Sequence, residues 1–495
     1  MAESEGRGED LRPGTRRGVV TKISAIWQNT AISSMATALQ GVANLVTVIY
    51  LARILAPLHY GIFSYTWAIS GMVGILTYLG IKPLLTRDLS RSGDPTQVVG
   101  YGLSLTALVS LIVAAGLVLG SLVMPGLVGY RDLFILWALF VFFNGVTPRW
   151  VYSGIQRLWM VSLGDLAGAL VRLGLTVLWV HGPEDLGLAV GITVLSVALP
   201  VVGEVLWLRR LVPFRCQRIS RREGFKTIRA GLPLAITSFV SILYSGVDTW
   251  ILHVYAGSRA VGYYAAAYRP IVFLNTFSAV YFNLTFPLMS RLTVHDRPTA
   301  ESVVQLAGIS ILALVIPIGV GIDVVAGPVM RQALGSRYAA SGPVLAVLIW
   351  SWCLALYRDI FSTTLMAGNQ EARFARLFAL VGGANLILMG GLVHWRAMGI
   401  AVALVTTQGL LLGGTLRSVR RIVRSPVDWA HHRASFLKIV GNSLAMGAIV
   451  WWVKASVPVE VAIALGIIVY GLLTWLTRAV PWPEVLAISR RPPSS

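Results

Sequence analysis

Charge and cysteine are both scarce in this chain of 495 residues. Only 13% of the residues are charged, whereas about 25% are charged in a typical soluble globular protein. Hydrophobic residues make up 56% of the chain, and the mean hydropathy is +0.73. A chain with so few charges cannot be surrounded by water on all sides. The composition therefore excludes an ordinary soluble protein and predicts an all-α protein that crosses a membrane many times.

Other features are missing too, and each absence excludes a class of function. The two cysteines, Cys216 and Cys353, are too few for a disulfide framework or a cysteine-based metal site. The polar stretch from Met1 to Ile26 contains no apolar segment, so we expect no cleavable signal peptide. The sequence has no G-x-x-x-x-G-K-[ST] phosphate loop, no metal-ligand spacing of histidines and no catalytic constellation. We therefore expect a protein that is not an enzyme and holds no cofactor, apart from a coupling ion such as H⁺ or Na⁺.

Basic residues are abundant by comparison, since 41 Lys and Arg face 21 Asp and Glu and give a net charge of +20. In a soluble protein this excess would indicate nucleic-acid binding. Membrane proteins, however, collect Lys and Arg in their cytoplasmic loops. We therefore attribute the charge to membrane topology and do not expect a nucleic-acid partner.

Fourteen segments have the length and apolarity of a membrane helix, which needs about 20 residues. They cover residues 29–52, 59–82, 98–122, 132–148, 159–181, 186–207, 230–253, 262–289, 302–327, 341–366, 375–394, 397–416, 439–457 and 459–477. If the N-terminus is cytoplasmic, the inside segments carry 31 Lys and Arg, the outside segments carry 7, and three arginines lie within spans. This bias predicts fourteen spans with both termini in the cytoplasm.

The two halves of the chain resemble each other. YGIFSYTWAI (60–69) matches VGYYAAAYRP (261–270), SGIQRLWMVSL (153–163) matches AGNQEARFARL (367–377), and LGLAVGI (186–192) matches MGIAVAL (398–404). The three matches have nearly the same offset along the chain, which predicts two pseudo-symmetric six-helix lobes with two extra C-terminal helices. Facing lobes of this kind are a usual framework for alternating access to a central site.

The spans and loops divide the chain into seven parts. In chain order these are a polar cytoplasmic tail (1–28), an N-terminal lobe (29–207), a basic linker (208–229), a C-terminal lobe (230–416), a second basic loop (417–438), the last two spans (439–477) and a cytoplasmic tail (478–495). The basic linker has two interpretations: a contact with anionic lipid or a glycosyltransferase of polysaccharide assembly, or simple retention on the inside by its charge.

The N-terminal block GVANLVTVIYLARILAPLHYGIFSYTWAI (41–69) and the segment GIKPLLTRDLSR (80–91) resemble a known family. Together with the two lobes and the two extra spans, they are similar to the Wzx-type O-antigen, capsule and exopolysaccharide flippases. These flippases belong to the multidrug/oligosaccharidyl-lipid/polysaccharide exporter (MOP) superfamily. The resemblance covers the whole chain in architecture, although the local signature is short.

The resemblance implies a multi-pass protein of the cytoplasmic (inner) membrane. It implies a flippase that moves an oligosaccharide linked to undecaprenyl or another isoprenoid diphosphate from the cytoplasmic to the outer leaflet. It also implies that an ion or the membrane potential drives transport, since such flippases are not driven by ATP. Arg53, which lies in the family-like Leu-Ala-Arg segment, is either a guard of an outer gate or a loop cation.

Arg269 is a charge inside the eighth predicted span, and Pro270 follows it directly. A charge at bilayer depth costs at least about 2.5–3.5 kcal/mol, so it is a functional hypothesis by default. We expect Arg269 to lie on a cavity wall and bind the substrate's diphosphate, because the guanidinium fork matches phosphate oxygens. The alternative is a structural ion pair with Asp248. Pro270 is expected to kink the helix and provide a hinge.

Two further pairs of charges lie inside predicted spans. Asp165 and Arg172 are seven residues apart and share a helix face, so we expect them either to line the same cavity or to lock two helices together. Arg358 and Asp359 are neighbours that point about 100° apart. We expect them to face different surroundings, with Arg358 on the cavity and Asp359 on a partner helix.

The remaining candidates are an acidic group, two amides and two aromatic side chains. Asp323, near the outer end of span 9, is either an ion-coupling carboxylate, together with Asp165, Asp248 and Asp359, or an interfacial group in water.

Gln40 and Asn44 share a face of span 1 and are either cavity groups or interhelical hydrogen-bond partners. Tyr264 and Tyr268 are four residues apart and lie beside Arg269, and they are candidate sugar contacts. Glu204, Arg87 and Arg131 lie near span ends, where snorkelling or loop exposure explains them.

Four alternatives stay open at this point. A multidrug or cation exporter of the same superfamily would have a more acidic cavity, whereas the intramembrane arginines favour an anionic substrate. A lipid II flippase also has fourteen spans. A membrane glycosyltransferase or polymerase would need a long outer loop with catalytic acids, and the predicted outer loops are short. A non-transporting scaffold would not need buried arginines.

Overall fold

The computed structural model describes the backbone of residues 13–78, 80–91, 94–242, 246–295, 297–423 and 429–480. Within these ranges the side chains are described outside 13–31, 233–242, 276–277, 279–288, 291–298 and 429–431. Every regular element of the described part is a helix, as the composition predicts.

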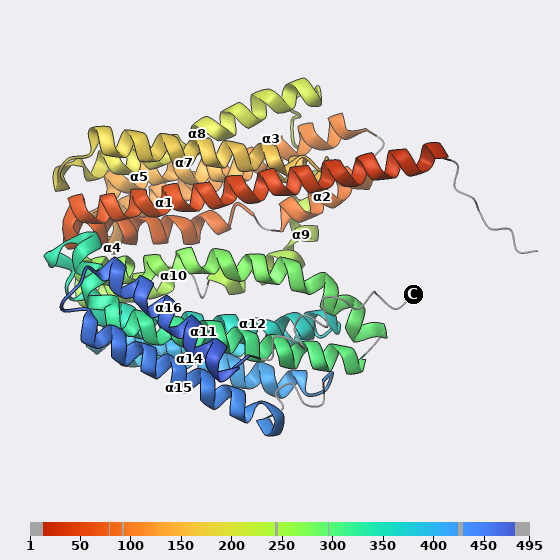
Figure 1. Cartoon of the computed structure of the whole chain (residues 1–495). Helices are drawn as coiled ribbons and strands as arrows, with labels where there is room; N and C mark the ends of the chain where they lie inside the picture. The colour runs from red at the N-terminus through yellow and green to blue at the C-terminus, as the bar shows by residue number, and fades with distance from the viewer. Residues whose placement is uncertain are drawn as a thin grey trace, which may run out of the picture.

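The first eight α-helices form one group, coloured red to yellow in Figure 1. They are α1 (Pro13–Ile75), α2 (Ile81–Arg91), α3 (Pro95–Val123), α4 (Pro125–Val128), α5 (Arg131–Val146), α6 (Arg149–Gly154), α7 (Leu158–Trp179) and α8 (Leu186–Leu211), with the short 3₁₀ turn η1 (Pro183–Asp185) before α8. We call this group the N-lobe.

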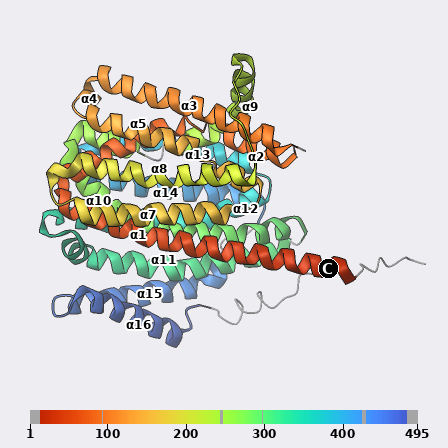
Figure 2. The same ribbon diagram turned by 90° about the horizontal axis from the view of Figure 1, so that it is seen from above.

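The second group, green to blue in Figure 1, is the C-lobe and its two following helices. Its elements are α10 (Val247–His295), α11 (Arg297–Leu334), η2 (Ser336–Tyr338), α12 (Ser341–Ala367), α13 (Glu371–Leu392), η3 (Val393–Trp395) and α14 (Ala397–Val419), then α15 (Trp429–Val453) and α16 (Val459–Thr477). Helix α9 (Arg221–Ile242) joins the lobes. Figure 2 shows α15 and α16 at one edge of the molecule, and both pack on α11.

Eleven helical segments of the described part are long and apolar enough to cross a membrane. One of them, Ile32–Ile75, contains a backbone break at Ala56 and therefore covers two of the predicted spans. The protein is accordingly a multi-pass membrane protein. The total of fourteen spans and the cytoplasmic position of the termini stay predictions.

The backbone breaks of α1 and α10 occur at equivalent places in the predicted repeat. Ala56 has φ 56° and ψ 169°, with Pro57 next to it, and Gly257 has φ 76° and ψ 172°. The two positions are separated by the same offset as the first sequence match. The break in α10 lies at Gly257, where a glycine adopts positive φ without a Cβ clash. The backbone is helical at Pro270, and a kink or hinge at that residue stays a prediction.

The second sequence match also has a structural counterpart. Gln156 and Asn369 both have positive φ, at 57° and 56°. In each turn a backbone N–H bonds a carbonyl five residues earlier, from Arg157 to Tyr152 and from Gln370 to Leu365. The same turn therefore ends α6 in the N-lobe and α12 in the C-lobe.

Two predicted spans differ from the observed helices. The span predicted over 59–82 ends at Ile75, and the short helix α2 follows after a turn at Gly80, which has φ 68°. The span predicted over 230–253 is interrupted before α10, where Gly246 has φ 97°. In both cases a glycine in the left-handed region directly precedes a new helix, in a segment that hydropathy alone predicts to be continuous.

Candidate functional site

The two lobes meet through a reciprocal pair of glycines near the breaks in α1 and α10. A Cβ at Gly61 would lie 1.8 Å from the Ser258 carbonyl oxygen, and a Cβ at Gly262 would lie 1.9 Å from the Pro57 carbonyl oxygen. Gly61 and Gly262 have the same offset along the chain as Pro57 and Ser258, so the contact obeys the symmetry of the repeat. Any larger residue would force the lobes apart, and we call this contact the outer gate because it lies on the predicted outer side.

Aromatic side chains reinforce the outer gate. The Tyr65 ring of the N-lobe stacks on the His253 ring of the C-lobe with centroids 3.7 Å apart. The hydroxyls of Tyr130 and Ser258 lie 3.4 Å apart across the same interface. The Tyr338 hydroxyl donates to the Ala52 carbonyl at 2.8 Å. The gate is therefore closed by both packing and polar contacts.

Next to the gate, a cavity of about 330 Å³ lies between the lobes. We call it the central cavity. Its lining comes from α1, α7 and α10 and comprises Thr37, Gln40, Gly41, Asn44, Leu45, Val48, Leu51, Phe63, Trp67, Arg172, Arg269, Val272 and Phe273. The structure thus brings together four of the predicted substrate-binding residues from three helices.

Two arginines in the central cavity have neutral partners. The Arg269 Nε donates to the Tyr60 hydroxyl at 3.0 Å, which joins the C-lobe to the N-lobe. The Arg172 Nη2 donates to the Asn44 Oδ1 at 2.7 Å, and the Arg172 Nε is buried without a hydrogen-bond partner in the described part of the protein. Neither arginine forms an ion pair with a described carboxylate. The alternative that Arg269 pairs with Asp248 is therefore wrong, and both cations have capacity to bind an anion.

Aromatic side chains that the sequence analysis did not select form part of the cavity wall. Phe63, Trp67 and Phe273 line it beside the two arginines. Phe63 and Trp67 are four residues apart on α1, a spacing that places them on one helix face. This spacing was readable in the sequence, but it did not distinguish a cavity wall from a packed core.

A second cavity of about 250 Å³ lies inside the N-lobe and shares Gln40, Asn44 and Arg172 with the central one. We call it the N-lobe cavity. Its other lining residues are Tyr78, Phe140, Asn144, Thr147, Arg149, Asp165, Gly168, Ala169, Ser196, Val197, Pro200, Val201 and Glu204. Asp165 and Arg172 therefore line the same cavity, which was one of the two interpretations of their spacing.

Charged groups of the N-lobe cavity and its surroundings include three that the sequence analysis missed or misread. Arg149 and Asp165 form an ion pair of 2.5 Å. Glu204, expected at an exposed span end, is only 7% exposed and accepts a long hydrogen bond of 3.5 Å from the Thr147 hydroxyl. Lys82 is 6% exposed and donates to the Asn144 carbonyl at 3.3 Å. Other parts of the N-lobe cover Glu204 and Lys82, so position along a span could not reveal their burial.

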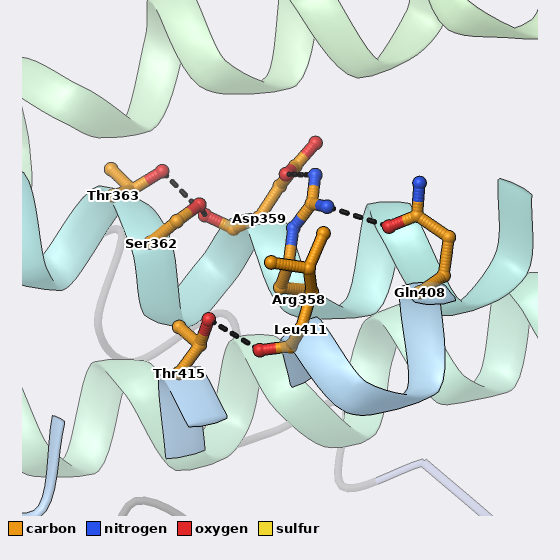
Figure 3. A network of polar contacts seen from close by, with 7 residues as sticks. All are labelled: Arg358, Asp359, Ser362, Thr363, Gln408, Leu411 and Thr415. Atoms are coloured by element: carbon orange, nitrogen blue, oxygen red, sulfur yellow. Dashed lines mark hydrogen bonds and ion pairs between the residues drawn. The ribbon is translucent and has the colours of Figure 1, made fainter. Parts of the chain in front are cut away.

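Arg358 lies outside both cavities, in a polar network of the C-lobe (Figure 3). Its Nη1 donates to the Gln408 Oε1 at 2.6 Å, and its Nη2 donates to the Asp359 Oδ1 at 2.7 Å. The expectation that Arg358 and Asp359 face different surroundings is therefore wrong. The Arg358 side chain is long enough to fold back onto its sequence neighbour while it bridges α12 to α14.

The two candidate sugar-binding tyrosines are not among the residues that line the cavity. Tyr264 is 1% exposed and donates from its hydroxyl to the Asp248 Oδ2 at 2.5 Å. Tyr268 stacks on Tyr264 with centroids 5.8 Å apart. Asp248 also accepts from the Thr249 N–H at 2.7 Å. The buried carboxylate draws Tyr264 into the C-lobe, so its assignment as a sugar contact is wrong.

The last two predicted residues do not line the central cavity. Arg53 is exposed on α1. Asp323 lines a separate groove of about 590 Å³ between α11, α12 and α15, whose other lining residues are mostly apolar.

The chain is similar to known proteins in sequence and in fold. Residues 26–293, more than half of the chain, match a family described as polysaccharide biosynthesis protein. A candidate O-antigen transporter of Escherichia coli (strain K12) is 20% identical over 394 residues, which cover 76% of this chain and 92% of that protein. A candidate O-antigen transporter of Shigella dysenteriae is 21% identical and covers 75% of this chain and 94% of that protein.

Solved structures with a similar fold are also transporters. The lipid II flippase MurJ in an inward closed conformation superposes with a TM-score of 0.70 at 14% identity, over 90% of this chain and 99% of that one. An inward-facing multidrug resistance MATE family transporter of the MOP superfamily superposes with a TM-score of 0.61 at 15% identity, over 77% and 94%. At such identities the likeness shows the fold alone.

Proposed function

Since the chain belongs to the polysaccharide biosynthesis protein family, we propose that it is a flippase for lipid-linked oligosaccharides. It moves an isoprenoid-diphosphate-linked oligosaccharide from the cytoplasmic to the outer leaflet of the cytoplasmic membrane, without enzymatic chemistry. The observation that carries this proposal is the pair Arg172 and Arg269. Both line one cavity between the lobes, and neither is neutralised by a described carboxylate.

The chemistry of the central cavity suits such a substrate. Arginine binds phosphate oxygens through its planar guanidinium group and stays protonated. An arginine inside a membrane costs free energy, so its presence there indicates a function. Gln40 and Asn44 supply hydrogen-bonding groups for sugar hydroxyls, and Phe63 and Trp67 supply apolar ring faces. The headgroup therefore has partners for both its charge and its sugars.

The Arg269–Tyr60 contact suggests how substrate binding opens the outer gate. Arg269 lines the cavity, and its Nε is also held by Tyr60 of the opposite lobe. A diphosphate competes for this guanidinium, because a bidentate ion pair with phosphate oxygens is stronger than a single hydrogen bond to a neutral hydroxyl. When the substrate recruits Arg269, the gate loses a polar contact between the lobes. Binding energy thereby favours alternating access.

Coupling to an ion is assigned to the N-lobe cavity. Asp165 and Glu204 line this cavity, which adjoins the substrate site through Arg172. We place a coupling H⁺ or Na⁺ at Asp165, with Glu204 as a second carboxylate. Asp248 and Asp359 are weaker candidates because they do not line this cavity, and Asp323 lies in a different groove.

The test is transport of a fluorescent lipid-diphosphate oligosaccharide in proteoliposomes. Arg269→Ala and Arg172→Ala should each reduce transport at least about tenfold, since each removes a charged contact with the phosphates. Arg53→Ala is the matched control, because Arg53 is an exposed arginine of the same membrane region that does not line the cavity. Full transport by Arg269→Ala and Arg172→Ala would refute their role.

A lipid II flippase is the second candidate, since the MurJ structure covers 90% of this chain at a TM-score of 0.70. Lipid II also carries an isoprenoid diphosphate, so the arginines suit both substrates. Parallel assays with fluorescent lipid II separate the two: faster transport of lipid II than of any oligosaccharide lipid would favour the second function.

A further inference from the structure

The linker between the lobes is bound firmly to the N-lobe surface. Gln217 donates from its backbone N–H to the Ser104 hydroxyl at 3.0 Å and from its Nε2 to the Gln97 carbonyl at 3.3 Å. A Cβ added at Gly100 of α3 would lie 2.4 Å from the Arg215 carbonyl oxygen. The linker therefore passes directly over this glycine. The start of α9 is therefore held in a defined place.

One side of α9 packs against α3. The hydroxyls of Thr227 and Tyr101 are 2.8 Å apart. Gly224 is buried near the Leu105 side chain, and Ile228 packs on the same apolar cluster. These α9 residues are three and four positions apart, which defines one helix face.

The opposite side of α9 is exposed and carries four cations around an aromatic ring. Arg221, Arg222, Lys226 and Arg229 are exposed, and Phe225 between them is 67% exposed. At 100° per residue, these five side chains fall within an arc of about 140°. We call them the basic face of α9.

The position of the basic face along the membrane normal decides whether it contacts lipid or bulk water. Helix α3 begins at Pro95 and has 29 residues, a length of about 43 Å that matches a bilayer with its headgroups, and α9 packs on α3 at Tyr101 and Leu105. At 1.5 Å per residue this is about 9–15 Å along α3, which is the depth of the headgroup and upper acyl region rather than of bulk water. Trp207 is 48% exposed on the neighbouring helix α8, with the Arg210 guanidinium 5.8 Å from its ring centroid. Such aromatic and basic pairs are typical of membrane interfaces.

From these observations we propose that the basic face of α9 binds anionic phospholipid headgroups on the predicted cytoplasmic side, with Phe225 inserted among the acyl chains. Eight Lys and Arg but only one acid, Glu223, lie between Arg209 and Arg229, so the charge is complementary to an anionic surface. Each such cation near an anionic membrane surface adds to the electrostatic attraction. Because this segment connects the two lobes, the bound lipids anchor the connection on which the lobes move.

The probe is a bimane fluorophore at Leu232→Cys, in a Cys216→Ser background of the full-length protein in nanodiscs. Leu232 is 52% exposed and lies beside the basic face, and the remaining Cys353 is buried. Quenching is compared between doxyl-labelled phosphatidylglycerol and doxyl-labelled phosphatidylcholine at equal mole fractions. We expect phosphatidylglycerol to quench at least about twofold more strongly, because four cations attract the anionic lipid.

Two fourfold variants make the test specific. In R221Q/R222Q/K226Q/R229Q the preference for phosphatidylglycerol should disappear. In R417Q/R420Q/R421Q/R433Q, which removes four exposed arginines from the second basic loop, the preference should remain. Thermal unfolding midpoints confirm that both variants are folded.

Three outcomes would overturn the proposal. Equal quenching by both lipids in the protein with an unaltered basic face would show that the charge of this face serves membrane topology alone. Loss of the preference in both fourfold variants would show a general effect of net charge. A preference that appears only with an isoprenoid diphosphate would assign the face to the substrate instead of to phospholipid.

Discussion

At the scale of single residues, Tyr60 matters because it holds Arg269 from the opposite lobe. The Tyr60 side chain is fully buried, and its ring lies 6.5 Å from the Tyr338 ring across the outer gate. In the proposed mechanism its hydroxyl competes with the substrate for one guanidinium, while its ring belongs to the closed gate.

Tyr60→Phe should bind substrate more tightly. The change removes a hydrogen bond to a charged group, worth about 1.5–3 kcal/mol at most, so we expect a half-saturating substrate concentration about three- to tenfold lower. Transport kinetics in proteoliposomes measure it. Tyr338→Phe is the control, since it loses an equivalent gate hydroxyl that bonds the Ala52 carbonyl and not Arg269. An unchanged half-saturating substrate concentration for Tyr60→Phe would show that Tyr60 does not compete with the substrate for Arg269.

Arg358 is a charge that lies in a polar network of the C-lobe and does not line the central cavity. Its side chain is 11% exposed and that of Asp359 is 24% exposed, so the ion pair is largely shielded from water. Its hydrogen bond to Gln408 ties α12 to α14.

Arg358→Leu should destabilise the protein by about 2 kcal/mol, because it leaves Asp359 without its partner in a poorly solvated place. The double variant R358L/D359L should recover most of the loss. Thermal unfolding in detergent, followed by tryptophan fluorescence, measures both. Equal destabilisation by the single and double variants would show that the ion pair is not the cause.

At the scale of elements, the breaks in α1 and α10 and the glycines beside them form one symmetric device. Gly61 meets the carbonyl beyond the Gly257 break, and Gly262 meets the carbonyl beyond the Ala56 break. Close backbone approach of two helices requires small residues at the contact.

Gly61→Ala should prevent closure of the outer gate. The added Cβ would lie 1.8 Å from the Ser258 carbonyl oxygen, a distance that rigid backbone cannot relieve without separation of the lobes. We expect Ser258→Cys to react faster with a membrane-impermeant maleimide in the Gly61→Ala protein. Gly71→Ala on the same helix is the control, because nothing lies within 4 Å of its added Cβ. The same rate in both proteins would argue against the gate.

At the scale of the whole molecule, the chain forms two lobes around a central cavity, with α15 and α16 attached to α11 outside them (Figures 1 and 2). The cations that line the cavity come from α7 in the N-lobe and α10 in the C-lobe. Movement of one lobe against the other therefore changes the separation of these charges.

The predicted orientation can be tested with the native cysteines. Cys216 is exposed in the linker and Cys353 is buried. An impermeant maleimide should not label Cys216 in intact cells, and it should label Cys216 in inside-out vesicles. Arg337→Cys in a Cys216→Ser background should show the reverse pattern, since Arg337 is exposed in η2 on the predicted outer side. Labelling of Cys216 from outside would invert the topology.

The sequence alone determined the features that depend on local pattern. The length of apolar segments identified most of the membrane helices, and the match of 60–69 with 261–270 anticipated the matching breaks at Ala56 and Gly257. Intramembrane arginines stood out because a charge among apolar neighbours is visible without a fold. Arg269, Arg172, Gln40 and Asn44 were selected in this way or by their shared helix face, and all four line the central cavity.

Only the tertiary structure decided which of these groups share a site. Arg358 looked equivalent to Arg269 in sequence, yet Asp359 and Gln408 satisfy it inside the C-lobe. Tyr264 was adjacent to the right segment but turns toward Asp248, and Glu204 looked exposed until other helices covered it. Such outcomes depend on contacts between residues far apart along the chain, because burial and pairing are properties of the packed lobes and not of any single helix.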